Sequence, residues 1–176
     1  MAIEIASYDP AWPGQFGVEA SKLTELLRPW LATPVEHIGS TSVPGLAAKP
    51  SIDMMAGVRD LHSAADAIPV LASHGYIHAQ HRPATLWFHK DRTDGDLEFG
   101  LHLTEPGSSL WRERLAFRDA LRTDPLLASQ YQELKEQLAG DGADLAAYTA
   151  GKREFVVQVL ARSGVTAEQW RQAGLG

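Results

Sequence analysis

Residues 35–58 read VEHIGSTSVPGLAAKPSIDMMAGV, and the prediction of both fold and site starts from them. Residues 35–38 are typical of a short strand, which ends at Gly39. A second apolar run, residues 52–58, contains one carboxylate, Asp53. A charged group on an apolar strand is costly unless something pairs with it. The stretch therefore predicts two strands joined by a loop, with a polar site where the strands meet.

The loop that follows Gly39 has the composition of a small anion cradle. A glycine lets the backbone approach a ligand closely because it has no Cβ, and Ser40 and Thr41 add hydroxyls and N–H groups beside it. A divalent cation on Asp53 would complete such a site, since hard cations that act on phosphates prefer carboxylate oxygen. Spacing alone leaves a second interpretation open, in which the loop only joins two strands and Asp53 accepts backbone hydrogen bonds.

The segment HIGSTSVPGLAAKP, with the Ile52-Asp53 that follows it, resembles the signature of the GrpB family, small proteins assigned to the nucleotidyltransferase superfamily. YDPAWP at residues 8–13 and LAFRDALRTDP at residues 115–125 are similar to further segments of that family. The resemblance implies an α+β fold: a nucleotidyltransferase-like mixed β-sheet packed against helices, with a C-terminal helical part.

In that superfamily a Gly-Ser or Gly-Gly turn precedes Asp-x-Asp or Asp-x-Glu, with x apolar, on the next strand. Gly39-Ser40 and Asp53 match the first two parts, which implies that Gly39, Ser40 and Thr41 cradle phosphates and that Asp53 holds Mg²⁺. Met55 stands where the second carboxylate is expected. Because a thioether is a poor ligand for Mg²⁺, this departure predicts a weakened metal site.

Residues 96–103, DLEFGLHL, alternate strictly between polar and apolar positions. This period of two predicts a strand that buries its odd positions and turns Asp96, Glu98 and His102 to one face. The resemblance implies a third metal carboxylate on such a strand, and Glu98 is preferred over Asp96 because it lies nearer the middle. The alternative is that this face is the solvated outer face of an antiparallel sheet.

Helices account for most of the remaining chain. Asp60, Asp124 and Asp144 are typical N-caps, and Pro69 is expected to kink or split the helix that it interrupts. The pattern predicts helices at about residues 16–31, from 60 to 73, after Ser108, after Asp124, and from 144 to 159, and a hairpin of strands that begin near residues 84 and 96.

Four basic residues are candidate phosphate partners. Lys49 precedes Pro50 and is therefore expected in extended backbone. Arg118, Lys135 and Lys152 lie in Phe-Arg-Asp, Tyr-x-x-Leu-Lys and Tyr-x-x-x-Lys segments that are similar to the family. Taken without the resemblance, Lys152 is an ordinary solvated lysine, and the alternative for Lys49 is an internal ion pair with Asp53.

The composition is that of a globular protein, with 176 residues, 44% hydrophobic and 22% charged, which predicts a single domain over residues 1–176. A net charge of −6 argues against a nonspecific nucleic-acid binder. It allows a small phosphorylated ligand, which needs only local positive charge. The chain has no cysteine, no apolar run of the ~18 residues that a membrane span needs, and an N-terminus without export features, so a cytoplasmic location is expected.

These observations predict nucleotidyl transfer from a nucleoside triphosphate to a small acceptor, with Mg²⁺ as cofactor. The expected metal ligands are Asp53, Glu98 and Asp96; the expected catalytic residues are Asp53, Glu98 and His102; the expected phosphate ligands are Gly39, Ser40, Thr41, Lys49, Arg118, Lys135 and Lys152. Met55 supports an alternative, a binding module for a nucleotide or small ligand that kept the fold without the transfer chemistry. A third interpretation is different chemistry in the same cleft with His102 as general base.

Overall fold

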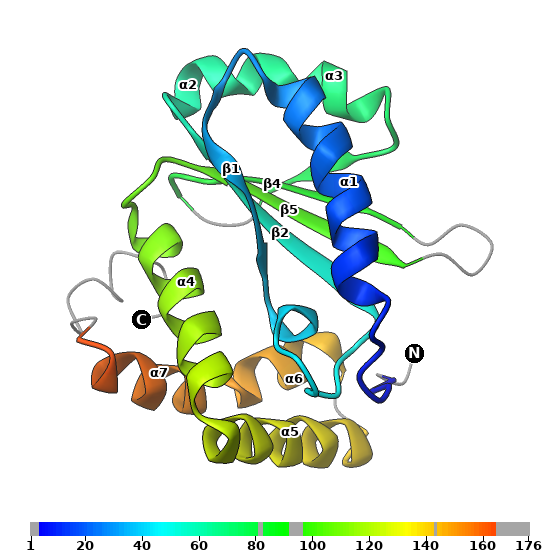
Figure 1. The fold of residues 1–176 in the computed structure, drawn as a ribbon, viewed down its shortest axis with the longest axis vertical. Coiled ribbons are helices and arrows are strands. Elements are labelled where there is room, and N and C mark those ends of the chain that lie inside the picture. The colour runs from blue at the N-terminus through cyan, green and yellow to red at the C-terminus, as the bar shows by residue number, and fades with distance from the viewer. Residues whose placement is uncertain (1–3, 81–82, 92–96, 143, 165–176) are drawn as a thin grey trace.

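A mixed β-sheet forms the centre of the computed structural model, which describes residues 4–80, 83–91, 97–142 and 144–164 (Figure 1). Within these residues the sheet has five strands in the order β1-β2-β5-β4-β3. β2 and β5 are parallel, and the other neighbouring pairs are antiparallel. The strands are β1 (Leu31–Ile38), β2 (Ser51–Val58), β3 (Ile77–Ala79), β4 (Leu86–Lys90) and β5 (Glu98–Thr104).

Helices flank the sheet in two groups, with α1, α2 and α3 at the top and right of Figure 1 and α4 to α7 at the lower left. The predicted α+β class, with a mixed sheet packed against helices and a C-terminal helical part, is therefore confirmed. The helices are α1 (Trp12–Leu27), α2 (Leu61–Ala64), α3 (Ile68–Ala72), α4 (Ser109–Thr123), α5 (Pro125–Gly140), α6 (Leu145–Gly151) and α7 (Arg153–Arg162), with short 3₁₀ helices at Ser40–Ser42 and Ala65–Ala67.

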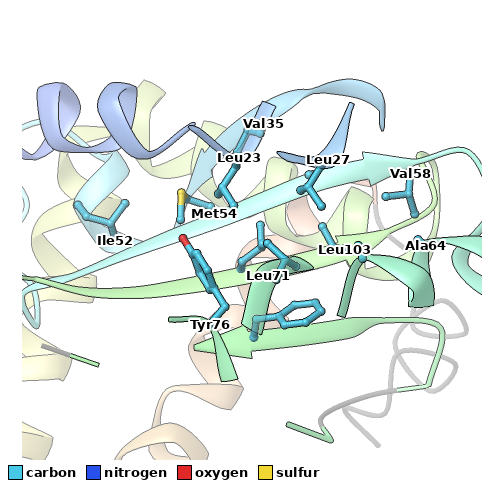
Figure 2. Packing of buried hydrophobic residues seen from close by; sticks show 14 of the residues in the cluster. Leu23, Leu27, Val35, Ile52, Met54, Val58, Ala64, Leu71, Tyr76 and Leu103 are labelled. Atoms are coloured by element: carbon cyan, nitrogen blue, oxygen red, sulfur yellow. The ribbon is translucent and has the colours of Figure 1, made fainter. Parts of the chain in front are cut away.

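The main core lies between the sheet and α1, α2 and α3. Figure 2 shows Leu23 and Leu27 of α1, Leu71 of α3 and Met54 of β2 meeting in this layer, where all four are fully buried. The apolar positions of β5 belong to the same core, as the alternation of residues 96–103 predicts. The opposite face of the sheet therefore carries the alternate positions of β2, β4 and β5.

A second apolar cluster joins the C-terminal helices to the loop that follows β1. Its buried members come from that loop, α4, α5 and α7: Val43, Leu46, Leu121, Leu127, Tyr131 and Val159. The loop between β1 and β2 is therefore packed against helices that lie far from it in sequence. None of the helices in the described residues has both the length and the apolar character that a bilayer crossing requires.

Several local predictions are confirmed. Asp60 accepts hydrogen bonds from the N–H groups of His62 and Ser63 at the start of α2, and Pro69 lies at the start of α3, where the predicted helix is split. β4 and β5 pair antiparallel, as the predicted hairpin requires. Asp96 lies outside the described residues.

Two helix boundaries were predicted wrongly. The first helix runs over Trp12–Leu27 rather than 16–31, because residues from Leu31 onward pair with β2 as strand β1. The predicted helix over residues 144–159 is two helices, α6 and α7, that meet at Lys152. A Cβ at Gly151 would lie 2.6 Å from the Leu138 side chain, so glycine at this junction permits close packing of α6 on α5.

Replacing Asp124 with alanine should lower the free energy of unfolding by about 1 kcal/mol. The Asp124 carboxylate accepts hydrogen bonds of 3.0 Å from the N–H groups of Leu126 and Leu127, which have no partner inside α5. Urea unfolding measures the change. Asp141→Ala at the other end of the same helix is the control and should cost nothing, since a carboxylate there opposes the helix dipole. Equal losses in the two variants would contradict the capping role.

Candidate functional site

A cavity of about 490 Å³ opens on the polar face of the sheet, between β2, β4, β5 and α6. Its position follows from the sheet register, which aligns Asp53 with Gly100 and Gly100 with His89. The lining residues are Ser40, Thr41, Lys49, Ser51, Asp53, Trp87, His89, Lys90, Asp91, Glu98, Phe99, Gly100, Tyr148, Thr149 and Lys152. The polar face of β5, for which a solvated outer face was the alternative prediction, therefore forms a cavity wall around Glu98 and Gly100.

Asp53 lies between two glycines that leave room for its carboxylate. A Cβ at Gly39 would lie 2.5 Å from Asp53 Oδ2, and a Cβ at Gly100 would lie 2.9 Å from Asp53 Oδ1. Gly39 also has φ of +71°, a left-handed conformation that favours glycine. The group that lies against Gly39 in the structure is the Asp53 side chain, and the close approach of a ligand to Gly39 stays a prediction.

Burial raises the pKa of Asp53, and the positive charges of Arg114, Lys152 and Lys49 oppose that rise. Within the described residues the Asp53 carboxylate has no hydrogen-bond or ion-pair partner. A carboxylate in this setting is stabilised by charges near it rather than by direct contact. It faces the cavity, where it can accept a hydrogen bond from a ligand or bind a cation that a ligand carries.

Of the lysines predicted as phosphate partners, Lys49 and Lys152 line the cavity. Lys49 donates to Glu98 Oε2 at 2.5 Å, so this lysine pairs with the other predicted carboxylate and not with Asp53. Lys152 places its ammonium 4.2 Å from the centre of the Tyr148 ring. Burial lowers the pKa of Lys152 to about 8, against the opposing effect of Asp53.

Ser40 and Thr41, the two hydroxyl residues at the start of the loop, both line the cavity. Ser40 lies near Tyr131 of α5 and opposes the rise that burial causes in the pKa of that tyrosine. Thr41 donates to the Ser51 carbonyl at 3.1 Å and lies 3.0 Å from His37 Nε2, so its hydroxyl ties β1 to β2. Thr41 also lines the cavity, so its role as a phosphate ligand stays a prediction beside these internal bonds.

Three other predicted residues do not line the cavity. Arg118 on α4 pairs with Glu36 and Asp119, each at 2.7 Å, and holds β1 against the helix. Lys135 is 2% exposed, and its ammonium donates to the Ala47 carbonyl. His102 is buried beside Trp87, with ring centres 6.4 Å apart. Each is held by the surrounding fold, which the spacing of residues in the sequence does not show.

The described residues do not provide a two-metal centre. Asp53 and Glu98 both line the cavity, but no group of three or more histidine, cysteine, aspartate and glutamate side chains in the described part of the chain is arranged to hold a metal ion. Met55, in the position of the expected second carboxylate, is fully buried on β2, in register with Glu36 and His102. Within the described residues the donor set therefore lacks the second carboxylate that the resemblance implies, while Asp96, another predicted ligand, lies outside them; the Mg²⁺ site stays a prediction.

Several residues that act on Asp53 or line the cavity were not identified from the sequence. Arg114, on α4 one turn before Arg118, gives the largest positive-charge effect on Asp53. Trp87 and His89 form an aromatic wall on β4, with ring centres 5.3 Å apart and planes 26° apart. Strand alternation places Trp87 and His89 on one face, and that was the available signal; the register with Gly100 was needed to connect this face to Asp53.

Comparison with known proteins gives matches along nearly the whole chain. The model of the GrpB protein family matches residues 2–162. The UPF0157 protein BH1888 of Halalkalibacterium halodurans is 34% identical over 167 residues, 94% of this chain and 84% of that protein. The UPF0157 protein PA4798 of Pseudomonas aeruginosa is 36% identical over 180 residues, 98% of this chain and 73% of that protein.

Among solved structures, the conserved protein GrpB from Enterococcus faecalis matches with a TM-score of 0.81 and 29% identity, covering 95% of this chain and 99% of that one. The Cid1 poly(U) polymerase matches with a TM-score of 0.47 and 11% identity, covering 85% of this chain and 50% of that one. The first match supports the arrangement of strands and helices described above.

Replacing Gly100 with alanine should lower the free energy of unfolding by about 1–3 kcal/mol, because the new Cβ would overlap Asp53 Oδ1. In an Asp53→Ala background the same substitution meets no carboxylate, and its cost should largely disappear because alanine suits a strand better than glycine. Urea unfolding of the four proteins gives the coupling energy. An equal cost in both backgrounds would show that Gly100 does not make room for Asp53.

Proposed function

This chain belongs to the GrpB family, and we propose that its cavity binds a small phosphorylated ligand, with a nucleotide as the preferred class. The observation that carries the proposal is the position of Lys152. Its ammonium lies in the cavity wall, packs on the Tyr148 ring, and has no carboxylate within ion-pair distance in the described part of the chain. A partly desolvated cation of this kind suits an anionic ligand.

The remaining walls fit the parts of a nucleotide. Lys49 and Ser40 add a second cation and a hydroxyl to the polar side of the cavity. The Trp87–His89 wall offers aromatic surface for a planar ring. A volume of about 490 Å³ is within the range of small-molecule sites. Asp53 then accepts a hydrogen bond from the ligand or contacts a cation bound to its phosphates.

Nucleotidyl transfer is the second candidate. It is favoured by two features: Ser40, Asp53 and Glu98 line one cavity, and Ser40 directly follows Gly39. The burial of Met55 and the pairing of Glu98 with Lys49 favour the binding module. Transfer would be supported if the wild-type protein releases pyrophosphate from ATP in the presence of Mg²⁺ and the Asp53→Asn variant does not. ATP binding without release would support the module.

Replacing Lys152 with methionine should weaken ATP binding about 10- to 100-fold, since a charge-assisted hydrogen bond contributes about 1.5–3 kcal/mol. Calorimetric titration measures the affinity. Lys22→Met is the control, because Lys22 is an exposed lysine on α1 that does not line this cavity. Unchanged affinity in Lys152→Met, or no binding of ATP or any other phosphorylated probe by wild type, would refute the proposal.

Replacing Trp87 with leucine separates ring recognition from phosphate recognition. ATP should bind about 5- to 100-fold more weakly, because stacking on an aromatic side chain contributes about 1–3 kcal/mol per base. Inorganic triphosphate has no ring and should bind the variant as it binds wild type. If both probes lose affinity equally, Trp87 shapes the cavity without stacking on the ligand, and the preference for a nucleotide is wrong.

A further inference from the structure

Lys135 is a buried cation that the proposed function does not use. It is 2% exposed, and its ammonium donates to the Ala47 carbonyl and lies 5.0 Å from the centre of the Tyr131 ring. Within the described residues no carboxylate pairs with it. Burying an ammonium group without a paired negative charge is costly, so its place in the fold needs a physical reason.

The contacts of α5 show what Lys135 holds. Gln132, one turn earlier, accepts a hydrogen bond of 3.1 Å from the Ala47 N–H. Gln132 and Lys135 thus bind both polar backbone groups of Ala47. The next residue, Ala48, exchanges two backbone hydrogen bonds of 2.9 Å with Ala6. The segment that leads into Lys49 is therefore fixed from α5 on one side and from the N-terminal segment on the other.

The same face of α5 also reaches the cavity. Tyr131, next to Lys135 on this face, lies near Ser40 of the cavity wall, which opposes the rise that burial causes in the pKa of Tyr131. Lys152, which lines the cavity, is a positive charge that acts on Lys135. Lys135 is therefore connected to the cavity wall through the Ala47 carbonyl, in the segment that leads into Lys49, and through the charge of Lys152.

We propose that Lys135 is a positioning residue that holds Ala47 and Lys49 for ligand binding, and that an anion bound in the cavity compensates its buried charge. The inference rests on the proposed function, because it needs a phosphorylated ligand. It assigns Lys135 no contact with that ligand. Its positive charge acts electrostatically on an anion in the cavity. Its hydrogen bond to the Ala47 carbonyl fixes the backbone that leads into Lys49.

The proposal has a consequence for protons. Burial, with a smaller contribution from the charge of Lys152, lowers the pKa of Lys135 to about 7, while Glu136 on α5 opposes the shift. The groups that face its ammonium are the Tyr131 ring, Glu136, Lys152 and the Ala47 carbonyl. An anion in the cavity raises the pKa of both lysines, so at about pH 8 binding should take up protons.

The test is calorimetric titration with ATP at about pH 8, in two buffers of different ionisation enthalpy, since ATP is already fully ionised there. Wild type should take up protons on binding. Lys135→Met should bind ATP about 3- to 10-fold more weakly and take up fewer protons. Hydrogen exchange of the 43–49 segment should be faster in the variant. Lys135→Gln serves if the methionine variant does not fold.

Gln132→Ala is the matched control, because it removes the side chain that binds the Ala47 N–H and leaves the charge of Lys135 in place. It should speed hydrogen exchange of the 43–49 segment and leave proton uptake unchanged. If Lys152→Met abolishes binding while Lys135→Met binds ATP and takes up protons like wild type, the inference is overturned and the proposed function stands. If wild type binds no ATP, the proposed function fails, and compensation of the Lys135 charge fails with it. Unchanged hydrogen exchange of the 43–49 segment in Lys135→Met would refute the positioning role.

Discussion

The parallel pairing of β2 with β5 is the constraint on which the site depends. It aligns Asp53 with Gly100. On the other side of β2, the antiparallel strand β1 ends at Ile38, which pairs with Asp53, and Gly39 follows. A side chain larger than hydrogen at either glycine would occupy the space of the carboxylate. One carboxylate is thereby held on the polar face of a sheet whose other face is filled by the main core.

Charge around this carboxylate comes from parts of the chain that meet only in the folded protein. Arg114 comes from α4, Lys152 from the α6–α7 junction, and Lys49 from the segment before β2. Their combined positive charge opposes the effect of burial on the pKa of Asp53. The cavity therefore combines an acceptor with cations on its walls, and this is the electrostatic basis of the proposal that it binds a phosphorylated molecule.

The C-terminal helices hold the loop from Ser40 to Lys49, which forms part of the cavity wall. An apolar cluster packs Val43 and Leu46 against α4, α5 and α7, and two polar side chains of α5 bind the backbone of Ala47. Catalytic or binding side chains need such support because their geometry must be fixed within a fraction of an ångström. The helical part thus has a role in the site as well as in stability.

The sequence by itself determined the α+β class, the family, the strands around Gly39 and Asp53, the alternation of β5, and the caps at Asp60 and Asp124, because these depend on local periodicity, turn chemistry and a contiguous motif. It also selected Lys49 and Lys152 as cavity cations. Tertiary structure decided that Lys49 pairs with Glu98, that Arg118 and Lys135 support the frame, and that Trp87 and Arg114 act near Asp53. Those outcomes depend on sheet register and helix packing, which join residues far apart in the chain and leave no local pattern in it.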